Sequence, residues 1–197
     1  MATNPQTATI SLDDFIGMAE ATDERLEFVD GAIVSLAGTS LEHGLVTQQI
    51  AYSLGAQLRG RGCGVLSQGT LVAPPGAEDA FLPDVVVFCG EPQRERLRGT
   101  DLLRNPVLLV EVLSRSTADY DHGRKWLSYR QIPTLQDYLL VAQNPPRVER
   151  YTRRGEHFWH YTETLGLDGE IRIESLNVTL KLAEIYEGVL TADEPSA

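Results

Sequence analysis

A glutamate inside an apolar run is the feature that most constrains how this chain can fold. The segment LLVEVL, residues 108–113, places Glu111 among valines and leucines. Such a run indicates a β-strand that is buried on both faces, and strands of this kind occur in sheets covered by helices on both sides. Burying an ionised carboxylate without a partner costs several kcal/mol or forces protonation. Glu111 therefore requires a positively charged partner inside the fold.

Chain length and charge limit the classes of protein to consider. With 197 residues the chain suits one domain spanning 1–197, with a core at roughly residues 10–190. We expect no membrane partner, because no apolar run approaches about 18 residues. The N-terminal segment lacks the basic and apolar regions of a secretory signal, which favours a cytoplasmic location. The formal net charge of −11 argues against a general nucleic-acid coat, although a site can still be locally basic.

Cysteine and lysine are scarce. The two cysteines, Cys63 and Cys89, do not form a CxxC pair, and we expect them to be reduced thiols without a function. Of the 17 basic residues only Lys125 and Lys181 are lysines. Because arginine is the usual cation of this chain, a lysine is informative, since its compact charge can change its pKa.

Caps, turns and apolar periodicity predict alternating helices and strands. Ser11 and Ser40 are good helix N-caps, and Asp30-Gly31 is a strong hairpin-turn signal. The predicted elements are helices at 12–21, 41–59, 119–132 and near 182–188; strands at 65–73, 82–89, 108–113 and 137–142; and hairpins at 24–37 and 147–163. In the second helix an apolar stripe is expected at Leu41, Leu45, Ile50, Leu54 and Leu58. Residues 90–106 are expected to form a long polar connection. The chain is therefore expected to be an α/β (α+β) protein.

A second carboxylate, Asp84, lies at the edge of the apolar run LPDVVVFC. Two carboxylates on adjacent buried strands repel each other unless a cation lies between them. A divalent ion offsets both charges, and Mg²⁺ needs only one or two protein carboxylates besides water or phosphate. The sequence thus predicts a metal site at Asp84 and Glu111. The alternatives are a strand-end cap for Asp84 and an ion pair with an arginine such as Arg124 for Glu111.

Lys125 lies 14 residues beyond Glu111 (125 minus 111), in the helix predicted after the buried strand. That helix can fold back over the strand end and bring an ammonium group near the metal. Such a lysine would orient or help deprotonate an attacking water, or stabilise the charge of the transition state. An exposed helix position is the alternative. Asp84, Glu111 and Lys125 around one cation predict hydrolysis of phosphodiesters.

Several short motifs in this order resemble the Uma-two-type restriction endonuclease family, a branch of the PD-(D/E)XK nuclease superfamily. The motifs are PD at Pro83-Asp84, EVLSRST at 111–117, and GRK followed by Tyr129. The segments LEFVDGAIV, SLEHGLV, DYLLV and SLNVTLKLAEIYEG extend the resemblance over nearly the whole chain.

The resemblance implies a restriction-endonuclease-like core, which is a mixed β-sheet flanked by helices. It also implies a Mg²⁺ or Mn²⁺ ion and hydrolytic cleavage of nucleic acid, with DNA as the expected substrate. Asp84 and Glu111 match the metal ligands of the family. Lys125 matches a catalytic lysine that has moved onto the following helix.

The chain departs from the family pattern at three places. Leu113 stands where the plain superfamily motif has its lysine, so the interpretation depends on Lys125 reaching the site. Arg115 replaces a turn proline, and Ala142-Gln143 stands where the family often has an acidic residue.

Four further residues stand out: two near the start of the second predicted helix, one in the first hairpin and one in the third predicted helix. His43 matches a frequent histidine of the family, although a capping or packing role is an alternative. Glu42 is a candidate third acidic group. Glu27 is interpreted as a structural residue of the first hairpin, and His122 as a helix-surface residue.

The sequence therefore predicts a divalent-metal-dependent endonuclease. Nearly all of the chain belongs to the core, so either a second copy builds the substrate groove or recognition is loose, and a homodimer is expected. The alternative is a catalytically inactive nuclease-fold protein that acts as a binding or regulatory homodimer. Leu113, the acidic balance and the missing acidic residue near position 142 keep this alternative open, and turnover separates the two.

Overall fold

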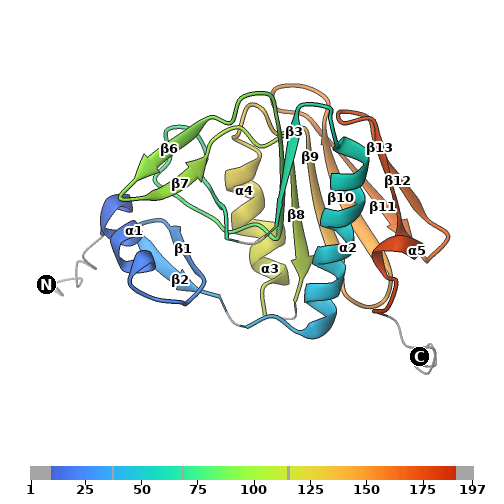
Figure 1. Ribbon diagram of the computed structural model, residues 1–197, viewed down its shortest axis with the longest axis horizontal. Coiled ribbons are helices and arrows are strands. Elements are labelled where there is room, and N and C mark those ends of the chain that lie inside the picture. The colour runs from blue at the N-terminus through green and yellow to red at the C-terminus, as the bar shows by residue number, and fades with distance from the viewer. Residues whose placement is uncertain (1–9, 37, 68, 115, 190–197) are drawn as a thin grey trace, which may run out of the picture.

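The centre of the molecule is a six-stranded mixed sheet, in agreement with the expected fold class (Figure 1). The computed structural model describes residues 10–36, 38–67, 69–114 and 116–189. The strand order is β11-β10-β9-β8-β5-β3, with β8 and β9 parallel and the other four pairs antiparallel. The strands are β3 (Cys63–Ser67), β5 (Val85–Cys89), β8 (Leu108–Leu113), β9 (Asp137–Ala142), β10 (Arg147–Arg153) and β11 (Trp159–Leu165).

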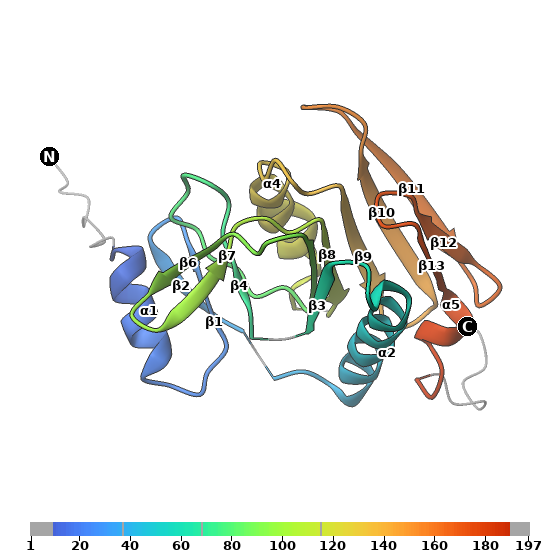
Figure 2. The same ribbon diagram turned by 45° about the horizontal axis from the view of Figure 1, so that its top comes forward.

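Helices cover both faces of this sheet, as the apolar strands predict (Figure 2). Helix α2 (Leu41–Leu58) packs on one face, and the other face carries a continuous helical segment of residues 118–129. That segment consists of α3 (Ala118–Tyr120), the π-helical turn η1 (Asp121–Lys125) and α4 (Trp126–Tyr129). None of the described helices is long and apolar enough to cross a membrane. The buried strands β8 and β9 thus lie in the middle layer.

The N-caps predicted from the sequence are confirmed. Ser11 begins α1 (Leu12–Glu20) with a capping box, and the Ser40 side chain accepts a hydrogen bond from the His43 backbone N–H. The predicted apolar stripe of α2 is only partly correct. Leu41 is 74% exposed in the first turn of the helix, and Val46 joins Ile50, Leu54 and Leu58 against the sheet.

Short strands outside the main sheet were missed or misplaced by the sequence analysis. The predicted strand 65–73 is in fact β3 and a separate β4 (Leu71–Val72), and the polar connection forms a hairpin of β6 (Arg94–Leu97) and β7 (Thr100–Leu103). A further hairpin, β12 (Glu170–Ile173) and β13 (Val178–Lys181), precedes α5 (Leu182–Ile185). Most of these segments are only four residues long, too short to show a clear apolar period.

The first hairpin is confirmed and brings an acidic residue into the interior. Strands β1 (Leu26–Val29) and β2 (Ala32–Ser35) are joined at Asp30-Gly31, whose φ angles of 52° and 78° are left-handed. All four residues of β1 are buried, including Glu27.

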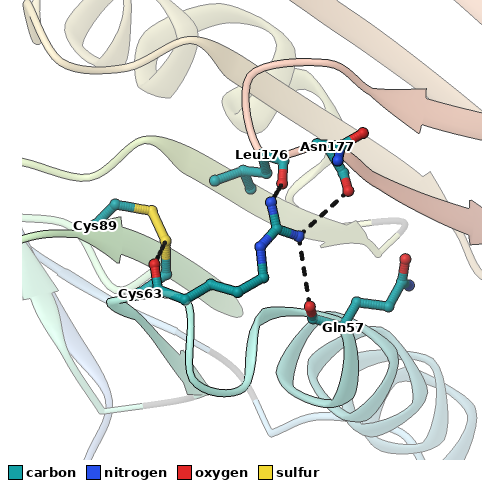
Figure 3. Close-up of a disulfide and its surroundings, with 6 residues drawn as sticks. Gln57, Cys63, Cys89, Leu176 and Asn177 are labelled. Carbon is teal, nitrogen blue, oxygen red and sulfur yellow. Dashed lines mark hydrogen bonds between the residues drawn. A yellow bond between two sulfur atoms is a disulfide. The ribbon is translucent and has the colours of Figure 1, made fainter.

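The two cysteines form a disulfide, so the expectation of reduced thiols is wrong (Figure 3). Cys63 and Cys89 lie directly opposite each other on the antiparallel pair β3–β5, with Cα atoms 4.0 Å apart. This register is a property of the sheet, and the separation of 26 residues in sequence does not reveal it. Arg61, just before Cys63, donates hydrogen bonds to the carbonyls of Leu176 and Asn177 and ties the end of α2 to the β12–β13 turn.

The double substitution Cys63→Ser and Cys89→Ser is expected to lower the free energy of unfolding by about 3–4 kcal/mol, because the disulfide closes a loop and restricts the unfolded chain. Denaturant unfolding of the variant beside the oxidised wild type measures this difference. Free thiols in the unfolded, unreduced wild type would contradict the prediction.

Candidate active site

The partner that Glu111 requires is Lys125. The Lys125 side chain is only 4% exposed, and its Nζ lies 3.0 Å from Glu111 Oε1. The same nitrogen lies 3.0 Å from Glu27 Oε1 and 3.3 Å from Asp121 Oδ1. All three carboxylates are buried. One ammonium group therefore stands at the centre of three acidic side chains, which we call the lysine cluster: Glu27, Glu111, Asp121 and Lys125.

Helical spacing places several members of this site on one side of the helix that covers the sheet. Asp121, Lys125 and Tyr129 follow one another at intervals of four residues, so their side chains lie on the same helix face. Tyr129 donates a hydrogen bond of 2.9 Å to Glu111 Oε1. The segment was predicted to fold back over the strand end, and it does so.

Contacts outside the lysine cluster also fix the position of the helical segment 118–129. The guanidinium group of Arg124 donates hydrogen bonds to Asp30 in the β1–β2 turn and to Asp79. Arg124 is therefore not the partner of Glu111, as one alternative proposed. It links the helix that carries Lys125 to the strand that carries Glu27.

Glu27 belongs to the lysine cluster, and sequence reasoning placed it only in the hairpin. Its Oε1 accepts a 2.8 Å hydrogen bond from the Leu82 backbone N–H, and its Oε2 accepts one of 2.9 Å from the Tyr120 hydroxyl. The signal that could have identified it is the same as for Glu111: a carboxylate inside the short apolar strand LEFV.

Asp84 lies beside the lysine cluster, one residue before β5. Because Val85 pairs with Val110, the next step of the antiparallel register sets Asp84 opposite Glu111. Asp84 Oδ2 accepts a 2.8 Å hydrogen bond from the Val112 N–H and lies 3.1 Å from His43 Nε2. Its Oδ1 lies 3.5 Å from a guanidinium nitrogen of Arg25. Asp84 thus caps a backbone group of the neighbouring strand and faces the cluster.

Burial and charge shift the pKa values of these groups in opposite directions. Burial raises the pKa of Glu111 well above its usual range, and Lys125 offsets this only in part. Burial alone would lower the pKa of Lys125, but the surrounding carboxylates raise it well above its ordinary value. Burial also acts to raise the pKa of Asp84, yet the hydrogen bonds from His43 and Val112 hold it below its usual value. Lys125 is therefore a permanent cation at neutral pH.

These residues line a pocket with a volume of about 590 Å³. Asp84, Glu111, Asp121 and Lys125 form part of its wall, and residues from the start of α2 and from the chain after β9 form other parts. His43 is buried against Asp84, whereas Glu42 is an exposed residue lining the pocket without a described contact to the acidic groups. The pocket gives a ligand access to both candidate metal ligands.

The donor set of this pocket suits a hard divalent cation. Among the residues that line the pocket, Glu42, Asp84, Glu111 and Asp121 carry four formal negative charges, and Arg25, Lys125 and Arg147 carry three positive ones, which leaves a formal charge of −1 (three minus four). Tyr129 and Lys125 both contact Glu111 through its Oε1 atom. Within the described residues no group of three or more His, Cys, Asp or Glu side chains is arranged to hold a metal. Two carboxylates nevertheless suffice for an ion such as Mg²⁺ that keeps several water ligands.

The departures from the family motif have identifiable structural positions. Leu113 ends β8, and its carbonyl accepts a 2.8 Å hydrogen bond from the side chain of Gln143. Gln143 in turn accepts a hydrogen bond from Ser40, so it ties the start of α2 to the end of β8. Arg115 lies outside the described residues.

His122 is less exposed than a helix-surface residue should be. Its Nε2 lies 3.0 Å from Glu149 on β10, and its side chain is 34% exposed. His122 is therefore a partly exposed helix residue, and its ring also contacts β10.

Comparison with known proteins identifies relatives along nearly the whole chain. The family described as "Putative restriction endonuclease" (Uma2) matches residues 12–183. An uncharacterised Synechocystis protein, sll1609, is 32% identical over 176 residues, covering 87% of this chain and 97% of its own length. A second one, slr1290, is 27% identical over 180 residues, covering 91% and 93%.

A solved structure has the same fold. It is a crystal structure described as a putative nuclease belonging to DUF820 from Anabaena variabilis, with a TM-score of 0.75 and 16% sequence identity. The alignment covers 92% of this chain and 99% of that one. Because the family model matches residues 12–183 and sll1609 is 32% identical over 176 residues, this chain belongs to the Uma2 family of putative restriction endonucleases.

Proposed function

We propose that this protein is an endonuclease that hydrolyses phosphodiester bonds of nucleic acid, with DNA as substrate, in a reaction that depends on a divalent metal ion. The observation that carries the proposal is the meeting of Asp84, Glu111 and Lys125 in one pocket. Membership of a family described as restriction endonucleases supports the same reaction.

Asp84 and Glu111 would hold the metal. A bound Mg²⁺ or Mn²⁺ would polarise a phosphate oxygen and favour a nucleophilic hydroxide. His43 and the Val112 N–H hold the Asp84 carboxylate in its ionised form and fix its orientation. Tyr129 and Lys125 bind Glu111 Oε1 and leave its other oxygen to the metal.

Lys125 acts through its charge. Because the carboxylates around it raise its pKa well above the ordinary lysine value, it does not take a proton from water near neutral pH. Of the roles considered for this lysine, deprotonation of the attacking water is therefore disfavoured. Its positive charge opposes the rise that burial causes in the pKa of Glu111, and it would offset negative charge that develops on the phosphate.

A specific observation favours the alternative function, a binding or regulatory protein that does not cut. Lys125 is almost fully buried and shared among three carboxylates, which is also the geometry of a structural ion cluster. In this case the protein would bind nucleic acid without turnover, and the lysine cluster would only hold the helix on the sheet.

Cleavage assays separate the two functions. Supercoiled plasmid and single-stranded DNA are incubated with the wild type in Mg²⁺, in Mn²⁺ and in EDTA. The endonuclease proposal expects nicking with a metal and none in EDTA. If the protein is folded and binds the same DNA but leaves it intact in every condition, the alternative function, a binding protein, is supported instead.

A further inference from the structure

A row of side chains leads away from the pocket on the same face of the sheet as Glu111. Residues that pair directly across neighbouring strands project to the same side. Glu111 pairs with Leu140, Leu140 with Glu149, and Glu149 with Glu163. The face of Glu111 therefore continues across β10 and the edge strand β11. On these two strands it carries Arg147, Glu149, Tyr151 and Arg153, opposite Leu165, Glu163, Tyr161 and Trp159.

Aromatic rings dominate the outer half of this face. Tyr151 stacks on Trp126 with ring centroids 4.3 Å apart, and Trp159 meets the same Trp126 ring edge-on at 4.9 Å. Tyr161 lies 5.3 Å from Tyr151 and is 47% exposed. We call Tyr151, Trp159 and Tyr161 the aromatic track. The inner rings support the track from below and leave Tyr161 and part of Trp159 open to solvent.

An arginine without an acidic partner stands at the far end of the track. The guanidinium group of Arg153 lies 4.3 Å above the Trp159 ring. Its N–H groups donate to backbone carbonyls of Leu135, Ile132, Arg130 and Glu156. It forms no ion pair with a carboxylate of the described residues, and the exposed Arg130 forms none either. In a chain with a net charge of −11, this end of the track is locally basic.

The acidic residues of the face do not block an anion. Glu149 is buried, and its carboxylate lies within 3.4 Å of Arg147 and 3.0 Å of His122 and accepts a hydrogen bond from Tyr161. Arg147 also lies 3.6 Å from Glu163, and the same arginine lines the pocket. The track is thus continuous with the candidate active site through Arg147.

We propose that the aromatic track binds single-stranded nucleic acid and leads it to the pocket. Bases stack on Tyr161 and Trp159, and phosphates lie near Arg153 and Arg147. Stacking on aromatic rings together with nearby positive charge is how many proteins hold single strands without reading their sequence. This inference rests on the proposed function, because it names the form of the substrate that the same site receives.

The spacing of the rings favours a single strand over a duplex. Trp159 and Tyr161 are two residues apart on one strand, which separates them by about 6.8 Å. In a duplex, successive stacked nucleotides of one strand are only about 3.4 Å apart along the helix axis. Successive bases can therefore reach successive rings only when the nucleic acid is extended and its bases are unstacked.

Intrinsic fluorescence tests the proposal directly, because the sequence has two tryptophans, Trp159 in the track and Trp126 of α4, which contacts the track. Oligo(dT) is titrated in EDTA, so that binding is measured without cleavage. Wild type is expected to show quenching that weakens with salt. Tyr161→Ala should lower the affinity by about fivefold to a hundredfold, and Tyr161→Phe, which keeps the ring, should lower it much less. Tyr52→Ala, at a tyrosine of α2 that is 74% exposed, is the matched control and should bind as wild type does.

Three results would overturn the inference. The first is equal affinity of Tyr161→Ala and wild type for oligo(dT), and the second is no binding of oligo(dT) by wild type. The third is a dimer that Tyr161→Ala converts to a monomer without a change in oligo(dT) affinity, which would make this face an interface between copies. The nuclease proposal is tested separately from the track. Metal-dependent cleavage of duplex DNA by the Tyr161→Ala variant would support the nuclease proposal even if the track does not bind a single strand. If the track binds oligo(dT) but the protein cleaves no DNA with any metal, the binding role of the track is supported and the nuclease proposal is contradicted.

Discussion

The variant Asp84→Asn is expected to lose divalent-dependent cleavage by about a hundredfold or more while it remains folded. Asparagine has the same shape and can still accept the hydrogen bond from the Val112 N–H, so the strand end keeps its cap. It lacks the negative charge that a Mg²⁺ or Mn²⁺ ligand supplies. Plasmid nicking at several metal concentrations, with circular dichroism of the same preparation, measures the effect.

The matched control is Asp168→Asn, which removes an exposed carboxylate in the loop after β11. It should cleave at the wild-type rate. Cleavage by Asp84→Asn at the rate of this control would remove Asp84 from the reaction. Partial recovery at higher metal concentration would instead agree with a weakened metal site.

The largest expected effect on stability comes from Lys125→Met. This change keeps the apolar length of the side chain and removes the ammonium group that contacts Glu27, Glu111 and Asp121. Breaking a buried ion pair by removing one partner typically destabilises a protein by about 3–5 kcal/mol. Urea unfolding at neutral pH should therefore show a loss of this size.

The loss should depend on pH with a definite sign. Burial already raises the pKa of Glu111, and without Lys125 it should rise further. When the pKa of a carboxyl group is higher in the folded than in the unfolded protein, the group does not destabilise the fold below its unfolded pKa, here 4.5. As pH rises through the folded-state pKa, the group ionises and the free energy of unfolding falls. The deficit of Lys125→Met relative to wild type should thus be smallest near pH 4.5 and grow toward neutral pH.

Two comparisons make this prediction specific. Lys181→Met changes the other lysine, which is exposed, and should have little effect on stability. The double variant Lys125→Met with Glu27→Gln removes one of the unpaired charges and should regain part of the lost stability. A Lys125→Met protein as stable as wild type at neutral pH would show that the carboxylates are not held by this lysine.

The sequence alone determined most of the main elements and the need for a charged site. Caps at Ser11 and Ser40 and the Asp30-Gly31 turn are local signals, because each depends on residues only a few positions apart. The buried run around Glu111 implied a covered sheet and a cationic partner for the same reason. The short strands of the smaller sheets carry too few residues for such a signal.

Only the tertiary structure decided which groups meet. Lys125 and not Arg124 reaches Glu111, because Arg124, its neighbour on the helix, donates to Asp30 and Asp79. Glu27 joins the cluster from a strand far away in the sequence. Cys63 and Cys89 pair through the register of two strands, and the same kind of register carries the face of Glu111 out to Tyr161. These contacts follow from the order and register of strands, which the local pattern of residues does not encode.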